Sequence, residues 1–220
     1  AESKNLKLFC ALNRRFDNEI CKLKTNISSI GNVNQLISIT RDFPYPSIDF
    51  LKNSSGLFND CALHDIDFIN WILEDVPEFV YVSAKITKPI EISGGITDDS
   101  CIHLEYSSGT RVFIYCSRIS KTYDQRIEII GEDGILEVKN PYGNITEFTD
   151  KKQNISFIDR YEESYKNELE YFYNLIMGRE FLLINKEECI NNICIIHACN
   201  QSYETKSKIK IKYVEITDND

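Results

Sequence analysis

Several signals that would reveal a function directly are absent from this chain of 220 residues. Its nine glycines form neither a GxGxxG dinucleotide fingerprint nor a GxxxxGKS/T phosphate-binding loop. No apolar run approaches the roughly 20 residues that a membrane-spanning helix needs. The basic charge that nucleic acid requires is also missing, because 34 acidic residues outnumber 25 basic ones and the net charge is -9. We therefore expect no nucleic-acid partner and no membrane anchor.

The eight cysteines are scattered along the chain and include no CxxC pair. Cys189, Cys194 and Cys199 recur at every fifth position, which on a helix turns successive side chains about 140° apart and is poor geometry for a shared metal ion. Single cysteines inside apolar runs are typical of buried free thiols. We therefore expect all eight to be reduced and buried, in a reducing compartment such as the cytoplasm.

The composition is otherwise that of an ordinary globular protein, with 42% hydrophobic and 27% charged residues. A chain of this length can bury a sizeable core. One basic cluster alternates with Ser and Ile, as on the solvent face of a terminal strand. Its members are Lys206, Lys208, Lys210 and Lys212. The first residue is Ala and not Met, so we expect the chain to be part of a longer protein.

The most informative segment is a predicted helix at 58–73, which carries two stripes of side chains with the same spacing. The polar stripe consists of Asp60, His64, Asp67 and Trp71. The apolar stripe consists of Ala62, Ile66, Ile69 and Leu73. The stripes begin two residues apart and so lie on nearly opposite faces of a helix. One face can enter a core while the other presents a carboxylate and an imidazole one turn apart, within reach of one small ligand.

This carboxylate–imidazole pair has more than one interpretation. A polar outer stripe is common in globular proteins, so Asp60 and His64 can simply form a surface pair. The ordinary pKa of His64, near 6.5, also suits proton transfer at neutral pH. A metal site formed by Asp60, His64 and Asp67 is a third alternative. The other histidines, His103 and His197, lie in apolar segments and are expected in the core or at a sheet edge.

The segments on either side of this helix follow different periodicities. Upstream, the apolar run at 6–12 has the pattern of a strand buried in a parallel sheet, and Asp17 can cap a helix to about residue 28. A strand is expected at 33–40 and an irregular loop at 41–54. Downstream, a period of two predicts an antiparallel meander. Its strands are expected at 79–87, 101–106, 112–117, 126–130, 135–138 and 145–148.

Helices are expected again at 162–177 and at about 186–206, followed by a last strand at 209–216. This order of elements predicts an α+β fold, with one large, mostly antiparallel open sheet and helices packed on one face.

Short motifs along essentially the whole chain resemble one enzyme family. They are FCALNRRFD at 9–17, GLFNDCALHDID with Trp71, Tyr123-Asp124 leading into IEIIGEDGI at 127–135, and Arg160-Tyr161 followed by Tyr165, Asn167 and Glu168. In combination and in this order they resemble the glucose–fructose oxidoreductase and inositol dehydrogenase family of NAD(P)-dependent dehydrogenases. The inositol dehydrogenase-like branch is the most similar.

The resemblance implies a substrate-binding and catalytic C-terminal domain that acts on a polyol or sugar together with NAD or NADP. It implies a homo-oligomer, dimer or tetramer, because the free face of the sheet often mediates such contacts in this family. It implies that His64 accepts the proton of the substrate hydroxyl and that Asp60 orients that hydroxyl or the imidazole. The residues that match positions lining the sugar pocket are Arg14, Cys61, Tyr123 and Tyr165.

The sequence departs from the family pattern at its beginning. The family's Rossmann domain and a Glu-Lys-Pro segment with a catalytic lysine should precede residue 1, and these 220 residues contain neither. We therefore expect residues 1–12 to be the end of that dinucleotide-binding domain, and residues 13–220 to form the substrate-binding and oligomerisation domain. The chain alone is expected to be inactive. Cys61 stands where the family often has Thr or a similar polar residue, so the sequence does not identify the polyol.

Two functions remain open at this point. In the first, the chain is the C-terminal part of an NAD(P)-dependent oxidoreductase that acts on a CH–OH group. In the second, it is a non-enzymatic carbohydrate-binding or oligomerisation module that lacks the nucleotide domain.

Overall fold

The computed structural model describes residue 4 and residues 6–139 and 156–214, which form one seven-stranded sheet and the helices around it. The strand order is β6-β5-β1-β4-β3-β2-β7. The strands are β1 (Val33–Arg41), β2 (Pro77–Lys85), β3 (Asp99–Tyr106), β4 (Arg111–Ser117), β5 (Asp124–Gly131), β6 (Ile135–Val138) and β7 (Ile209–Lys210). β1 runs parallel to β4, and the other neighbouring pairs are antiparallel. The predicted α+β class is confirmed.

The predicted meander is only partly correct. β2, β3 and β4 lie side by side as expected, but β1 is inserted between β4 and β5 and pairs with both. Side-chain alternation shows which face of a strand is buried but not which strand lies beside it. The position of β1 between β4 and β5 could therefore not be predicted from the sequence. The strand predicted at 145–148 lies outside the described residues. The last strand is shorter than predicted and spans Ile209–Lys210.

The helical segments agree with the predicted ones except for short additions. They are η2 (Asn13–Phe16), α1 (Asn18–Asn26), η3 (Ile27–Ile30), α2 (Ile48–Asn53), η4 (Phe58–Ala62), α3 (Leu63–Leu73), α4 (Ile90–Ser93), α5 (Phe157–Ile176) and α6 (Lys186–Thr205). Asp17 caps α1 as predicted, because its carboxylate accepts the backbone N–H of Glu19 and Ile20. α2 lies in the predicted loop at 41–54 and is too short to show a periodicity. None of the helices in the described part of the chain has the length and apolarity to span a membrane.

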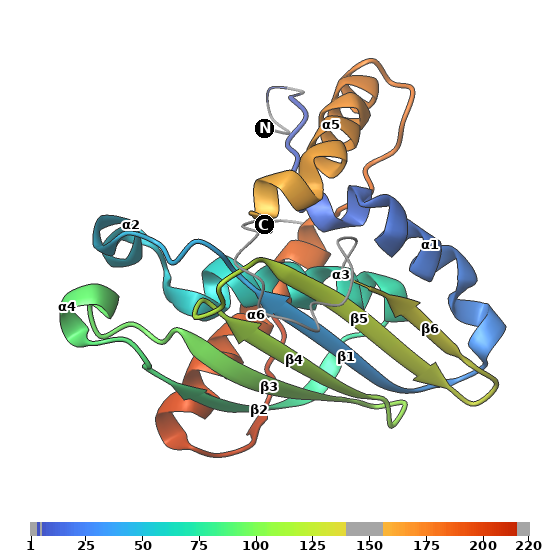
Figure 1. Ribbon diagram of the computed structural model, residues 1–220. Coiled ribbons are helices and arrows are strands. Elements are labelled where there is room, and N and C mark those ends of the chain that lie inside the picture. Colours follow the sequence, from blue (N-terminus) through green and yellow to red (C-terminus); the bar gives the residue numbers. More distant parts are fainter. Residues whose placement is uncertain (1–3, 5, 140–155, 215–220) are drawn as a thin grey trace.

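The core lies between one face of the sheet and the helices α3 and α6 (Figure 1). Alternate side chains of the central strands point into it and are at most 2% exposed. They include Leu36, Val80, Val82, Ile102, Leu104, Val112, Ile114, Ile127 and Ile129. From the helices, Ile66, Ile69, Ile195 and Ile196 close the same cluster. The opposite face of the sheet carries no helix among the described residues, so the sheet is open on one side.

The helix at 58–73 is buried on nearly all sides, and its polar stripe is not a uniform surface face. Its apolar residues face the core as expected, but η2 lies across the polar stripe. Asp67 is only 1% exposed and accepts two hydrogen bonds from Arg15, from Nε at 2.9 Å and from Nη2 at 2.7 Å. Asn192 of α6 donates a third, at 2.8 Å. The predicted spacing of the polar stripe is correct, but the residues that contact the stripe come from segments far away in the sequence.

Two further predictions need correction. Residues 6–12 form no strand, because the described residues offer them no neighbouring strand to pair with, and Leu6 and Leu8 are exposed. The assignment of residues 1–12 to a separate domain stays a prediction. All eight cysteines are free, as expected, but not all are buried: Cys10 is exposed. His197 is also exposed, on α6, and not in the core.

The buried pair between Arg15 and Asp67 leads to a stability prediction. We expect Asp67→Ala to lower the free energy of unfolding by about 3–5 kcal/mol, because it leaves the Arg15 guanidinium buried without its main partner. Glu19→Ala, which breaks the exposed pair with Lys22, is the control and should change it by less than about 1 kcal/mol. Urea unfolding followed by circular dichroism measures both. Similar losses in the two variants would contradict the prediction.

Candidate active site

The candidate site begins at a π-helical turn. η4 spans Phe58–Ala62, and the backbone N–H of Leu63 bonds back to the carbonyl of Phe58, five residues earlier. The turn continues directly into α3, so one helix carries Asp60, Cys61 and His64. A π turn widens the helix locally and is frequent at functional sites. The residue pattern of an α-helix does not show such a turn, and the sequence did not predict it.

The π turn lies beside a cavity of about 320 Å³. The residues lining it are Asn13, Arg14, Thr40, Asp42, Phe50, Asp60, Cys61, His64, Tyr123, Phe157, Tyr161 and Tyr165. They come from η2, the end of β1, α2, η4, α3, the segment before β5, and α5. All six site residues named from the sequence, Arg14, Asp60, Cys61, His64, Tyr123 and Tyr165, therefore meet around one cavity.

Six lining residues were missed from the sequence. Asn13 and Tyr161 belong to motifs that were recognised but not assigned to the site. Asp42 and Phe50 lie in the segment at 41–54, whose length and irregularity had pointed to function. Thr40 and Phe157 gave no signal, because one looks like an ordinary strand residue and the other like the start of a helix.

Arg14 supplies a positive charge at the cavity wall, and this charge is paired with a buried carboxylate. Its Nη1 lies 2.8 Å from Oδ1 of the fully buried Asp65, which also accepts hydrogen bonds from Ser38 at 2.7 Å and Thr40 at 2.8 Å. Burial alone would lower the pKa of Arg14, but Asp65 together with Tyr161, Tyr123 and Cys116 outweighs it, and the pKa is raised well above its ordinary value. The guanidinium carbon lies 5.7 Å from the ring centroid of Tyr161. The side chain is therefore charged and held on several sides.

His64 is kept in its neutral form. Burial and, to a smaller extent, the nearby Arg14 lower its pKa to about 4, although Asp65 acts in the opposite direction. Its Nδ1 is buried and has no hydrogen-bond partner among the described residues. At neutral pH the imidazole therefore has one nitrogen free to accept a hydrogen bond or a proton from a ligand in the cavity.

Asp60 is held from behind by an arginine that does not line the cavity. Arg118 follows β4, its side chain is completely buried, and its Nη2 donates to Oδ2 of Asp60. The Asp60 side chain itself remains 31% exposed. Cys61 faces inward next to it and contacts the thiol of Cys116, and this hydrogen bond together with burial raises the pKa of Cys116 well above its ordinary value. Asp60 can therefore present its second oxygen to a ligand.

Two tyrosines that line the cavity share Gln125 as a hydrogen-bond partner. The hydroxyl groups of Tyr161 and Tyr123 donate to Oε1 of Gln125, at 3.0 and 3.3 Å. Burial raises the pKa of both tyrosines, so they are neutral hydroxyl groups at physiological pH. Burial also raises the pKa of Asp42 and Tyr165, which face the same space. The cavity thus combines neutral hydroxyls, an imidazole and carboxylates, all of which hydrogen-bond well to a polyhydroxylated ligand.

The metal alternative at Asp60, His64 and Asp67 is not supported. Asp67 is fully engaged by Arg15 and Asn192 and does not line the cavity. Within residues 6–139 and 156–214, no three His, Cys, Asp or Glu side chains are grouped in a way that could hold a metal ion.

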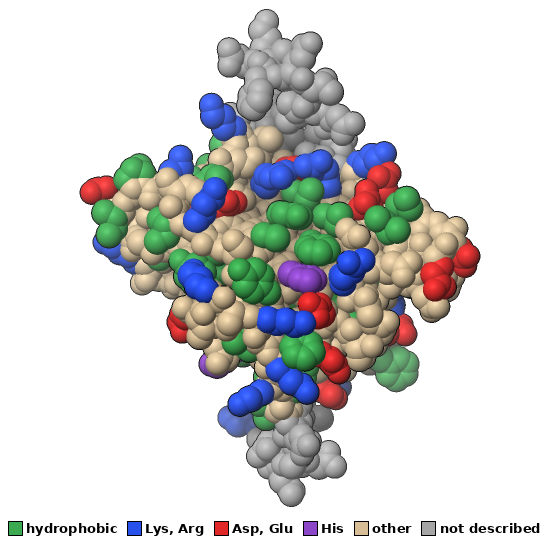
Figure 2. Space-filling model, turned by 90° about the horizontal axis from the view of Figure 1, so that it is seen from below, with side chains coloured by type: hydrophobic (Ala, Val, Ile, Leu, Met, Phe, Trp, Pro, Cys, Tyr) green, Lys and Arg blue, Asp and Glu red, His purple; other side chains and the backbone are tan. Residues whose placement is uncertain are grey.

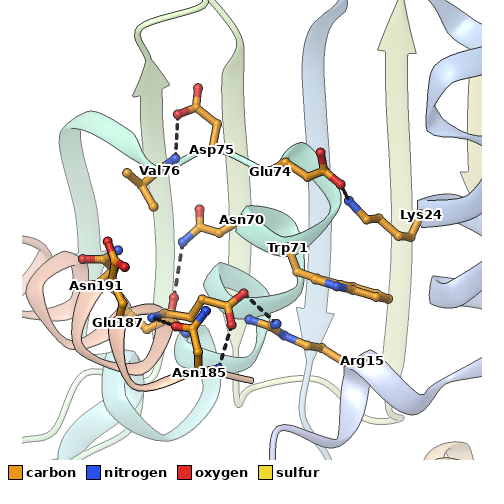
Figure 3. A pocket seen from close by; sticks show the side chains of 12 residues that line it. Arg15, Lys24, Asn70, Trp71, Glu74, Asp75, Val76, Asn185, Glu187 and Asn191 are labelled. Carbon is orange, nitrogen blue, oxygen red and sulfur yellow. Dashed lines mark hydrogen bonds and ion pairs between the residues drawn. The ribbon is translucent and has the colours of Figure 1, made fainter. Parts of the chain in front are cut away.

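A second cavity, of about 500 Å³, lies beside the C-terminal end of α3 (Figure 3). Trp71 forms part of its wall, with the Arg15 guanidinium carbon 5.8 Å and Lys24 Nζ 5.9 Å from its ring centroid. The charged groups here pair with one another: Arg15 with Glu188 at 2.9 Å, and Lys24 with Glu74. None of the site residues named from the sequence lies here, so the smaller cavity is the stronger candidate for a site.

An open, mostly antiparallel sheet covered on one face by helices, with a polar cavity at the start of the central helix, defines a class of α+β domains. The chain belongs to the family of GFO/IDH/MocA C-terminal domains, whose family model matches residues 28–137.

Individual relatives and solved structures agree with this family. The myo-inositol 2-dehydrogenase of Thermotoga maritima is 30% identical over 217 residues, which cover 94% of this chain and 65% of that protein. The inositol 2-dehydrogenase of Rhizobium meliloti is 29% identical over 215 residues, covering 93% of this chain and 65% of that protein. The crystal structure of a probable dehydrogenase from Thermotoga maritima superimposes with a TM-score of 0.85 at 29% identity, over 95% of this chain and 66% of that one. The chain thus spans about 65% of the length of these curated relatives.

The neutral state of His64 leads to a prediction about stability and pH. The folded-state pKa of about 4 is below the ordinary 6.5, so as the pH falls below 6.5 the unfolded chain takes up this proton first and the fold loses stability. We expect this single group to account for up to about 3 kcal/mol of lost stability between pH 6.5 and 4. His64→Asn should lose correspondingly less over that interval.

Urea unfolding at pH 7.5, 6, 5 and 4.5 measures this difference, and His197→Asn is the control because His197 is exposed. A free-energy difference between His64→Asn and the unaltered chain that does not change with pH would show that His64 is not buried in its neutral form.

Proposed function

We propose that this chain forms the substrate-binding part of an NAD(P)-dependent oxidoreductase that acts on a CH–OH group of a polyol or sugar, as inositol dehydrogenases do. The observation that carries the proposal is the meeting of Asp60, His64 and Arg14 around one polar cavity, on the fold of this family. The names of the relatives support the same substrate class, since several are inositol 2-dehydrogenases.

The electrostatics of the cavity support an uncharged, hydroxyl-rich substrate. Arg14 at the cavity wall is matched by Asp65, and Arg118, which does not line the cavity, is matched by Asp60. Among the described residues that line the cavity, no unpaired cation remains to favour a phosphate or carboxylate group, which would be expected to bind through arginine. A volume of about 320 Å³ suits one small ring and not a long oligosaccharide.

In this proposal His64 accepts the proton of the substrate hydroxyl and Asp60 orients that hydroxyl or the imidazole. The low pKa of His64 means that its neutral form is ready to accept. Arg14, Cys61, Tyr123 and Tyr165 hold the remaining hydroxyl groups of the substrate.

The cofactor is proposed to be NAD, in preference to NADP. One relative is named as an NAD(+)-dependent scyllo-inositol 2-dehydrogenase, and one fold neighbour from Lactobacillus casei was solved with NAD(H) and scyllo-inositol. The described residues do not fit a dinucleotide by themselves, because they offer no glycine-rich phosphate cradle and the cavity is too small. We therefore derive no step through the nucleotide. The free thiols of the chain support a reducing compartment such as the cytoplasm.

The open face of the sheet is proposed to bind a second copy of this chain. Figure 2 looks at this face and shows hydrophobic side chains gathered around a histidine, with charged groups near them. The outward side chains of neighbouring strands here include Ile37, Ile39, Tyr81, His103, Phe113 and Tyr115. His103 and Phe113 stack with ring centroids 4.6 Å apart, and Tyr115 is 43% exposed. A flat patch of this kind is typical of an interface between subunits.

The enzyme proposal is tested with the protein as its gene encodes it, assayed with myo-inositol and scyllo-inositol and with NAD+ or NADP+ in separate reactions. We expect His64→Ala to lower kcat/KM by about 100-fold or more, because the acceptor of the hydroxyl proton is lost. His197→Ala removes an exposed histidine and should leave kcat/KM unchanged. Equal activity of the two variants would contradict the role of His64. Binding of a polyol without any turnover would favour a non-enzymatic binding module.

The interface proposal is tested by sedimentation. We expect the chain to sediment as a dimer or tetramer, and the double substitution Ile39→Glu and Tyr115→Glu to give monomers, because these residues lie opposite each other on neighbouring strands and two charges there oppose burial of the patch. Phe181→Glu is the control, since this side chain is 93% exposed in the link between α5 and α6. An unaltered chain that sediments as a monomer at all concentrations would contradict the proposal.

A further inference from the structure

We propose that Arg118 is a positioning residue that holds the Asp60 carboxylate at the cavity wall, and that it serves the site and not the stability of the fold. The proposal rests on the function proposed for this site. It concerns a residue that does not line the cavity and belongs to none of the motifs recognised in the sequence.

Arg118 is fixed at both ends. Its backbone N–H donates to the carbonyl of Asp98 at 2.8 Å, which ties it to the segment before β3. Its guanidinium lies under the ring of Phe50, 5.9 Å from the centroid, and its Nη2 donates to Asp60. Among the described residues, Arg118 is the only ion-pair partner of Asp60. The direction of the Asp60 carboxylate is therefore set by one side chain that is itself immobile.

Arg118 also remains positively charged. Burial would lower its pKa, but the neighbouring Cys61, Asp60 and Cys116 together outweigh burial and raise the pKa above its ordinary value. Its Nε and Nη1 are buried and have no hydrogen-bond partner among the described residues. A buried guanidinium with two unpartnered nitrogens costs free energy, and an aliphatic side chain in the same place would avoid that cost. Stability alone therefore does not explain an arginine at this position.

Comparison with the other buried arginines points to the same conclusion. Each of these arginines has a buried carboxylate among its partners: Asp65 is 0%, Asp67 1% and Asp17 7% exposed as partners of Arg14, Arg15 and Arg160, and Arg15 pairs in addition with Glu188, which is 31% exposed. In the fourth pair the arginine is 0% exposed while the carboxylate of Asp60 is 31% exposed. The first three pairs join segments of the fold. The fourth presents its acid to the cavity.

The first test observes Asp60 directly and does not depend on turnover. The protein as its gene encodes it is labelled with 13C at the aspartate carboxyl carbons, and the Asp60 resonance is assigned by its loss in Asp60→Asn. Besides Arg118, the groups facing Asp60 are Asp42, Cys61 and His64, and none of them is altered. We expect Arg118→Met to change the chemical shift of the Asp60 carboxyl carbon at neutral pH, because the charged hydrogen bond to the carboxylate is lost, and Arg118→Lys to restore most of the change.

The second test observes the proposed reaction. We expect Arg118→Met to lower kcat/KM for the polyol by about 10- to 100-fold in the unaltered background and by less than about 2-fold in an Asp60→Asn background. A Met variant that reduces activity equally in both backgrounds would show that Arg118 does not act through Asp60. Should Arg118→Met fail to fold, Arg118→Gln takes its place, with the same expected change in the Asp60 chemical shift.

The two tests separate the two proposals. A protein without turnover on any polyol would contradict the proposed function, while the change in the Asp60 chemical shift would still establish Arg118 as its positioning residue. An unchanged Asp60 chemical shift in Arg118→Met, with the fold intact, overturns the inference whatever the activity.

Discussion

The structure depends on the neutralisation of buried arginines by three carboxylates of one helix. The pairs are Arg14–Asp65, Arg15–Asp67 and Arg118–Asp60. The arginines come from η2 and from the end of β4, so the pairs join the N-terminal segment and the sheet to the helix at 58–73. Because a buried charge that loses its partner costs several kcal/mol, neither segment can move away from the helix without a large penalty. The helix is thus the common partner of elements that are otherwise distant in the sequence.

The same neutralisation sets the chemistry of the cavity. Burial and the fixed charge of Arg14 together keep His64 neutral, although Asp65 lies nearby and favours its protonated form. The hydroxyl groups of Tyr123 and Tyr161 remain protonated for the same reason, because burial disfavours the phenolate. A cavity with its charges paired in this way suits proton transfer from a neutral hydroxyl. It would bind an anionic substrate weakly.

The sequence predicted the elements well and their neighbours poorly. Periodicity located β1 to β5 and the long helices to within a few residues, because side-chain spacing reflects local backbone geometry. It did not show that β1 lies between β4 and β5, or that the segment at 6–12 stays unpaired, because pairing depends on distant partners. In the site, spacing selected Asp60 and His64, and the resemblance to a family added Arg14, Cys61, Tyr123 and Tyr165. Arg118 acts from behind Asp60, and no local pattern could have shown this contact.

The course of η2 explains why one polar stripe of a helix serves two different purposes. The stripe of Asp60, His64, Asp67 and Trp71 has the spacing of a single face, but η2 crosses it. The neighbouring residues Arg14 and Arg15 point to different cavities, so the first half of the stripe faces the candidate site and Trp71 faces the second cavity. Between these two parts of the stripe, Asp67 pairs with Arg15 and is not available to a ligand. The N-terminal segment therefore divides a uniform helical face into a part available to a ligand and a part that fastens the fold.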